Sequence, residues 1–124
     1  IRMHAGLNTP APVQHAITVA LGDYEHVAKE KEIYCARREI LLPAVKTFGF
    51  EVTDSEAGLY IWATLGEDCW TTVARMAELG ILVAPGSLYG TSSVNHVRFA
   101  LTATDERIAE GARRLENALG LEHR

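Results

Sequence analysis

The 124-residue sequence has few cysteines and no long apolar segment. Its two cysteines, Cys35 and Cys69, are far apart and form no C-x-x-C pattern, which argues against a disulfide scaffold and against a zinc site. No apolar run approaches the roughly 18 residues that cross a bilayer, and the first residues lack the pattern of a signal peptide. We therefore expect a protein of the reducing cytoplasm with no membrane span.

An excess of charge of either sign is also lacking. The net charge is −4, and basic residues alternate with acidic ones along the chain. Nucleic acids and anionic membranes attract clustered positive charge, so we expect neither as a partner. The hydrophobic fraction of 48% is typical of a folded globular protein, and the length fits one domain with a single core.

Motifs of several enzyme classes are missing. The sequence contains no G-x-G-x-x-G, no G-K-[ST] and no G-x-S-x-G pattern, which argues against dinucleotide binding, a P-loop and a hydrolase elbow. No residue is therefore predicted to be catalytic. The histidines show no metal-ligand spacing, so we predict no metal site and interpret each of them as structural or exposed; they are His4, His15, His26, His96 and His123.

Hydrophobic periodicity and turn residues predict the order helix, helix, strand, strand, helix, strand, strand, helix. Pro43 lies inside the long second helix and predicts a kink there. The alternating basic and acidic residues of this helix predict a solvated face. The first two strands are expected to pair as a hairpin, and Thr64 and Glu67 have the spacing of a capping box before the third helix. The predicted helices are 11–22, 23–49, 67–79 and one from 104 onward, and the predicted strands are 50–52, 59–63, 81–84 and 96–101.

These elements predict an α+β fold of two layers, with a small, mainly antiparallel sheet and helices on one face. The other face of the sheet has no predicted cover. A free-standing domain usually covers or polarises such a face, whereas part of a larger enzyme can rest it on a neighbouring domain.

Arg98 is the first candidate binding residue. In an alternating strand it shares a face with His96 and Ala100, while Val97 and Phe99 point to the core. A guanidinium so placed can bind a carboxylate through two parallel hydrogen bonds. The alternative is a surface arginine whose stem covers the sheet.

The segment 85–90 is the second candidate, because its glycines allow backbone to come close to a ligand. The alternative is an ordinary turn. Tyr60 and Trp62 share one face of their strand, where they either line a pocket or pack beneath a helix.

Three stretches of the sequence resemble the class I/II aminotransferases, which are fold-type I pyridoxal-phosphate enzymes. They are Gly58–Ala63, Leu79–Gly90 and His96–Leu101. The opening Gly6–Gln14 is similar to the segment that follows the cofactor lysine by several dozen residues in that family. The stretch Ala100–Ile108 resembles the succinyldiaminopimelate aminotransferases of lysine biosynthesis.

The resemblance implies that residues 1–124 are the C-terminal small domain of such an enzyme, with 1–22 joining it to a large domain upstream. It also implies that Arg98 binds the α-carboxylate of an amino-acid or keto-acid substrate and that Tyr89 or Ser87 approaches the substrate side chain. Asn8 would lie near an active site shared between the two subunits of a homodimer.

The activity that the resemblance implies is amino-group transfer between glutamate and a keto or aldehyde acceptor, with pyridoxal 5'-phosphate as electron sink. The cofactor lysine and the phosphate-binding loop of the family would lie upstream. Lys29, Lys31 and Lys46 have the wrong context to replace that lysine. We therefore expect this chain alone to bind no cofactor and to be inactive. Because the loss of a neighbouring domain would leave apolar surface exposed, we also expect the chain alone to self-associate.

Two other interpretations remain open. In the first, the chain is a free-standing α+β module that is regulatory or that binds amino or keto acids through Arg98. In the second, the chain is a pure interaction domain.

Overall fold

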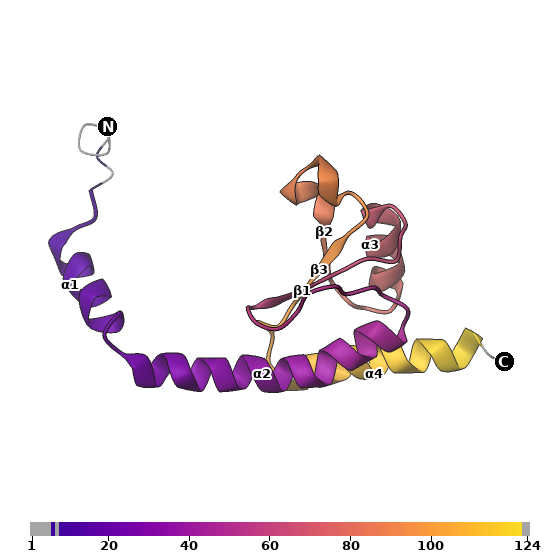
Figure 1. Ribbon diagram of the computed structural model, residues 1–124, viewed down its shortest axis with the longest axis horizontal. Helices are drawn as coiled ribbons and strands as arrows, with labels where there is room; N and C mark the ends of the chain where they lie inside the picture. The colour runs from indigo at the N-terminus through magenta and orange to yellow at the C-terminus, as the bar shows by residue number, and fades with distance from the viewer. Residues whose placement is uncertain (1–5, 7, 123–124) are drawn as a thin grey trace. The chain divides into compact units, whose positions relative to one another are not determined.

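The computed structural model describes Gly6 and residues 8–122. The chain divides after Glu32 into two compact units. The first contains α1 (Ala11–Ala20) and the start of α2 (Tyr24–Thr47), and the second contains the rest of α2 and all later elements (Figure 1). In the described part of the chain, no helix is both long and apolar enough to cross a membrane. His4 and His123 lie outside the described residues.

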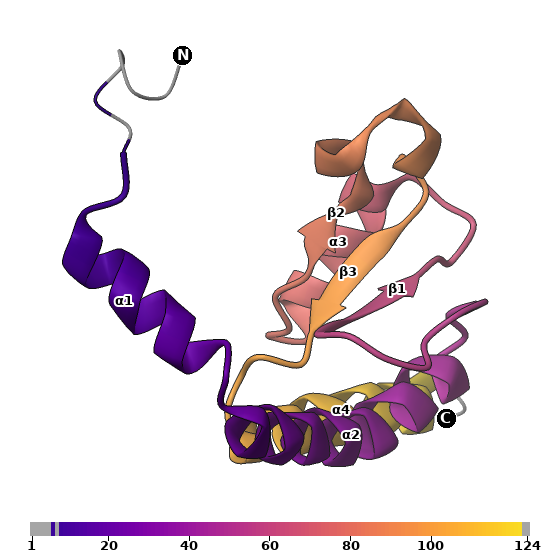
Figure 2. The same cartoon turned by 60° about the vertical axis from the view of Figure 1, so that its left-hand side comes forward.

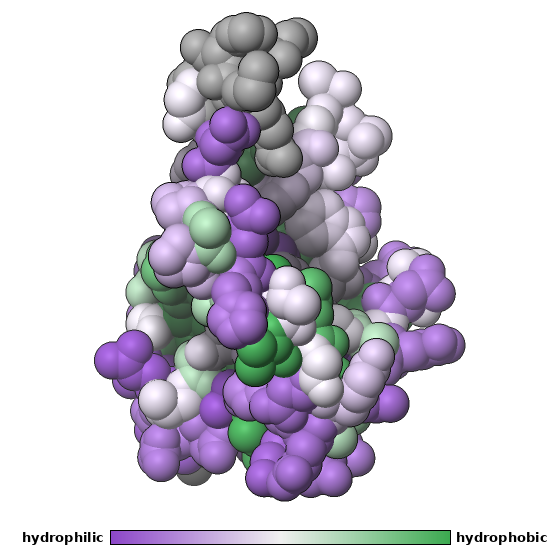
Figure 3. Space-filling model, turned by 90° about the vertical axis from the view of Figure 1, so that its left-hand side faces the viewer, coloured by the Kyte–Doolittle hydropathy of each residue, from purple (hydrophilic) through white to green (hydrophobic). Residues whose placement is uncertain are grey.

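The first unit exposes apolar side chains. Helix α1 lies within the predicted range 11–22, and Pro12 occupies its first turn, where no backbone N–H is needed. None of its residues is buried, and Val13 and Ile17 are 45% and 49% exposed. Figure 3, which shows the left-hand side of Figure 1, has hydrophobic residues, drawn in green, at the surface.

Helix α2 matches the predicted long helix and contains Pro43 in its interior. Its apolar stripe is buried only toward the end, where Leu41 and Val45 join the core. Val27 and Ile40 of the same helix are 59% and 45% exposed.

The prediction that the charged residues of α2 form a solvated face is wrong for two arginines. Arg38 is buried and donates a hydrogen bond to the carbonyl of Gly58. Arg37 pairs with Asp105 at 2.6 Å and donates to the carbonyl of Leu101 at 3.0 Å. Both guanidinium groups therefore connect α2 to chain segments beside the sheet.

The sheet of the second unit has the strand order β1-β3-β2 and is antiparallel. Its strands are β1 (Tyr60–Ala63), β2 (Ala84–Pro85) and β3 (Val97–Ala100). The predicted strand 81–84 is mostly irregular, and β2 is only two residues long.

The predicted hairpin between 50–52 and 59–63 is wrong. Only Glu51 contributes, through a bridge to Thr64, and β1 pairs with β3 instead. The pairing with β3 places Ile61 opposite Phe99 and Ala63 opposite Val97. All four of these side chains are buried, so this register collects apolar surface on one face of the sheet.

Helix α3 (Cys69–Glu78) begins with a different cap from the predicted one. The Asp68 carboxylate accepts hydrogen bonds from the backbone N–H groups of Trp70 and Thr71. The hydroxyl of Thr64 donates instead to the carbonyl of Asn95. An aspartate next to the first turn satisfies orphan donors that the more distant threonine does not reach.

All three α-helices of the second unit contribute to the core on one face of the sheet, and none of these three helices lies on the other face (Figures 1 and 2). The two-layer α+β prediction is confirmed. The part of α2 that belongs to the second unit and α4 (Asp105–Glu122) lie side by side below the sheet in both views. The buried core residues are Leu41, Ala44, Val45, Phe50, Ile61, Ala63, Cys69, Met76, Val83, Val97, Phe99, Leu101, Ile108, Ala112 and Leu115.

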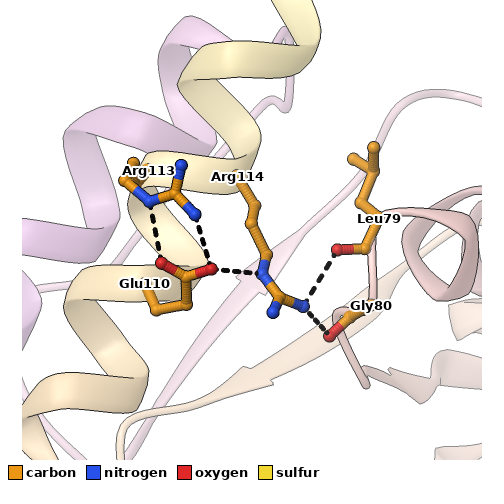
Figure 4. A network of polar contacts seen from close by, with 5 residues as sticks. All are labelled: Leu79, Gly80, Glu110, Arg113 and Arg114. Atoms are coloured by element: carbon orange, nitrogen blue, oxygen red, sulfur yellow. Dashed lines mark hydrogen bonds and ion pairs between the residues drawn. The ribbon is translucent and has the colours of Figure 1, made fainter.

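A polar network joins α4 to the end of α3 (Figure 4). Arg114 donates to the carbonyls of Leu79 and Gly80, which satisfies acceptors that a helix C-terminus leaves free. Hydrogen bonds from Arg113, which has the larger effect, and from Arg114 lower the pKa of Glu110 to about 2. This network fixes the position of α4 relative to the segment that leads into β2.

Candidate functional site

The helix-free face of the sheet carries the polar and aromatic side chains that alternate with the core residues. Tyr60 and Trp62 belong to β1, and Arg98 belongs to β3. Arg98 is paired in register with Trp62 on one side and with Ala84 of β2 on the other. Arg98 therefore has an aromatic neighbour in register on β1 and a small side chain, a methyl group, in register on β2.

The guanidinium of Arg98 is held by aromatic rings. Its central carbon lies 4.0 Å from the ring centroid of Tyr60 and 5.3 Å from that of Tyr89. The Nε atom is buried and has no hydrogen-bond partner. Among the described residues, Arg98 forms no ion pair with a carboxylate, so no carboxylate neutralises its charge.

Trp62 connects the other aromatic residues of this face. Its ring meets the Tyr89 ring edge-on, with centroids 5.5 Å apart and planes at 86°. It also stacks on the imidazole of His96, with centroids 5.5 Å apart and planes at 9°. Both geometries are favourable for aromatic pairs. The four rings of Tyr60, Trp62, Tyr89 and His96 therefore form a wall beside Arg98.

Two short 3-10 helices bring Tyr89 to this wall. They are η1 (Gly86–Tyr89) and η2 (Thr91–Ser93), which follow β2 directly. The backbone N–H of Gly86 donates to the carbonyl of His96 at 2.8 Å. A Cβ at Gly86 would lie only 2.0 Å from the Ser93 carbonyl oxygen and 2.6 Å from that of His96. Only glycine allows this close approach, which corresponds to the glycine-bounded loop that the sequence predicts.

The structure brings together some of the predicted site residues. Arg98 and Tyr89 are neighbours, whereas Ser87 is exposed on η1, and its hydroxyl has no hydrogen-bond partner among the described residues. Asn8 is exposed and lies in the first unit, before α1. The binding roles of these residues stay predictions.

Sequence reasoning only partly identified the aromatic wall. Tyr60 and Trp62 were expected either in a pocket or beneath a helix, and the structure leaves both on the helix-free face. His96 is half-buried and stacks on Trp62, although its residue type indicated only a structural or exposed group. Its placement two residues before Arg98 in an alternating strand was the available signal.

A hollow of about 510 Å³ lies elsewhere in the second unit, between α4 and residues 80–82. Phe99 and Ala100 contribute to it, but Arg98 and the aromatic wall do not. Its charged residues include Glu110 and Arg114, which already bind each other. We therefore assign the candidate site to Arg98 and the aromatic wall.

The described residues offer no metal centre, because no three histidine, cysteine or acidic side chains among them lie close enough to hold an ion. Their lysines are on α2: Lys29 pairs with Glu25, and Lys46 is exposed near the end of the helix. A lysine that could form a Schiff base is thus not found on the Arg98 face.

Comparison with known proteins identifies a family. The profile described as "Aminotransferase class I and II" matches residues 1–115. The chain is 52% identical to 4-dedimethylamino-4-oxo-anhydrotetracycline transaminase of Streptomyces rimosus, over 93% of this chain and 32% of that protein. It is 53% identical to a probable aminotransferase of Mycobacterium tuberculosis, over 93% of this chain and 28% of that protein. The chain thus spans about a third of the length of these relatives.

Among solved structures, the N-succinyldiaminopimelate aminotransferase of Mycobacterium tuberculosis is 29% identical. It superposes with a TM-score of 0.73, covering 90% of this chain and 32% of that one.

Proposed function

The chain belongs to the class I and II aminotransferase family, and we propose that it is the C-terminal small domain of a pyridoxal-phosphate-dependent aminotransferase in which Arg98 binds the substrate α-carboxylate. In this proposal residues 1–22 join the domain to a large domain upstream. The whole protein acts as a homodimer in the cytoplasm, and Asn8 contributes to the shared active site.

The observation that carries the proposal is the state of Arg98. Arg37 and Arg114, in the same unit, each bind a carboxylate of the chain, Asp105 and Glu110 respectively. Arg98 binds none, although its Nε is buried. A buried donor without a partner is costly, and a planar guanidinium matches the two oxygens of a carboxylate. A carboxylate ligand would pair with a guanidinium charge that no carboxylate of the described residues neutralises.

We further propose that the enzyme exchanges an amino group between glutamate, which is the amino donor, and the keto acid that corresponds to succinyldiaminopimelate. The resemblance of Ala100–Ile108 and the similarity to the mycobacterial structure support this assignment. The substrate α-carboxylate would bind Arg98, and its side chain would extend past Tyr89 and Ser87.

Pyridoxal 5'-phosphate supplies an electron sink in such enzymes. The described residues do not fit that group, because the Arg98 face presents neither a lysine nor a pair of groups that could cradle a phosphate. We therefore assign the cofactor to the rest of the protein and substrate binding to this chain. The isolated chain should show no transaminase activity.

The test is Arg98→Lys in the full-length protein. Lysine keeps the charge but loses the bidentate geometry. The KM for glutamate should rise about 10- to 100-fold, which is the factor expected for the loss of one hydrogen bond to a charged group. Arg75→Lys is the matched control, because Arg75 is half-exposed and pairs with Glu67 outside the candidate site. An unchanged KM in Arg98→Lys would contradict the proposal.

The alternative is a free-standing module that is regulatory or binds amino or keto acids. The size of the gene product distinguishes this module from a domain of a larger enzyme. An antibody raised to this chain should detect a protein about three times larger than its 13.6 kDa, as the coverage of the relatives indicates. A single band at 13.6 kDa would favour the module.

A further inference from the structure

We infer that Tyr60 is a positioning residue that holds the Arg98 guanidinium ready for a carboxylate, a role that rests on the proposed function. Tyr60 is paired with Ala100, and Trp62 with Arg98, so Tyr60 is the diagonal neighbour of Arg98 on the same face. The distance of 4.0 Å from ring centroid to guanidinium carbon is well inside the range of a cation–π contact.

An aromatic ring positions a cation without occupying its donors. A carboxylate neighbour would accept N–H groups and neutralise the charge, as Asp105 does at 2.6 Å from the Nε of Arg37. The ring of Tyr60 attracts the guanidinium through its π face and accepts no N–H in the guanidinium plane. Arg98 is thereby kept in place while its donors stay free for a ligand.

The backbone beside Tyr60 is fixed from two directions. Arg38 donates to the carbonyl of Gly58, and the carbonyl of Leu59 accepts from the N–H of Leu101 at 2.8 Å. Tyr60 is 41% exposed, so packing in the core does not explain its position. The ring is thus held by its strand and is directed to the guanidinium rather than to the hydrophobic core.

Tyr89 contributes a second, more distant ring. Its centroid is 5.3 Å from the guanidinium carbon, and its own ring contacts Trp62. Because the attraction falls with distance, Tyr60 should supply the larger share. Removing the ring of Tyr60 should allow the guanidinium to sample orientations that do not match a carboxylate.

The first experiment measures steady-state kinetics of the full-length protein carrying Tyr60→Ile. Isoleucine preserves strand propensity, and the exposure of Tyr60 means that no large cavity forms. The KM for glutamate should rise about 2- to 30-fold, the range of a cation–π contact, with kcat changed less than KM. Tyr60→Phe keeps the ring and should restore a KM close to that of the wild type. Tyr60→Leu is a second ring-free variant with the same expectation.

Tyr34 offers a matched control. Its ring centroid lies 5.7 Å from the guanidinium carbon of Arg37, a cation–π contact outside the candidate site. Tyr34→Leu should leave the KM for glutamate unchanged. An equal rise in Tyr34→Leu and Tyr60→Ile, or a rise in Tyr60→Phe as large as in Tyr60→Ile, would overturn the inference.

A double-mutant cycle separates this inference from the proposed function. If Tyr60 acts through Arg98, then Tyr60→Ile should add little to the KM of Arg98→Lys. If Arg98→Lys raises KM and Tyr60→Ile does not, the inference fails and the proposed function stands. If Arg98→Lys leaves KM unchanged, the proposed function itself fails.

Discussion

Replacing Gly86 with alanine should destabilise the chain and displace the loop beside Arg98. Gly86 is buried at the start of η1. The added Cβ would lie 2.0 Å from the carbonyl oxygen of Ser93 and 2.6 Å from that of His96. Both are backbone atoms, so no change of side-chain rotamer relieves the contact, and the two short helices must move away from β3.

The magnitude follows from two contributions. Overpacking by one methyl group in a tightly packed place costs about 1–3 kcal/mol. The hydrogen bond from the Gly86 N–H to the His96 carbonyl, 2.8 Å long, contributes about 1 kcal/mol more if it is broken. The expected loss is therefore about 2–4 kcal/mol, a large part of the stability of a small domain.

Gly111→Ala is the matched control. Gly111 lies inside α4, and apart from the backbone of its own helix no atom lies within 4 Å of the place that an added Cβ would take. Alanine should stabilise the chain there by about 0.5–1 kcal/mol, because it favours a helix interior over glycine.

Urea unfolding, followed by circular dichroism and by the fluorescence of Trp62 and Trp70, measures the free energy of unfolding. The midpoint should fall for Gly86→Ala with little change in the m-value, and it should rise for Gly111→Ala. A Gly86→Ala protein within about 0.5 kcal/mol of the wild type would refute the close approach between η1 and β3.

Two further variants test the elements around the site. Asp68→Ala should lower the free energy of unfolding by about 1 kcal/mol, because it removes the N-cap of α3, and thermal unfolding measures the loss. A loss of stability in Glu67→Ala but not in Asp68→Ala would contradict the assignment of Asp68 as the cap. Glu110→Gln should reduce stability by its full amount only above the ordinary carboxyl pKa. Arg113 and Arg114 lower the pKa of Glu110 to about 2, so the stabilisation is present above about pH 4.5 and is lost as pH falls toward 2. Urea midpoints at pH 7 and pH 2.5 check this: the difference between variant and wild type should shrink at the lower pH.

The sequence predicts much of the second unit because its residues alternate or recur regularly. The alternation of Val97 and Phe99 with Arg98 placed the arginine on the face opposite the core, and the structure agrees. The start of α4 and its buried residues Ile108 and Leu115 follow in the same way from helical spacing.

What the sequence does not reveal depends on contacts between distant segments. Arg38 has a charged helical environment, and only the fold places the Gly58 carbonyl beside it. The stacking of Tyr60 on Arg98 depends on the register of β1 with β3, which a pattern of period two leaves undetermined. The aromatic wall is therefore visible only after the strands are paired.

The most direct test of the account is a crystal structure of the full-length protein with a bound amino-acid substrate. We predict that both oxygens of the α-carboxylate accept hydrogen bonds from Arg98, at about 2.7–2.9 Å, with the Tyr60 ring still stacked on the guanidinium. A substrate carboxylate bound by another cation, with Arg98 turned away from it, would contradict the account.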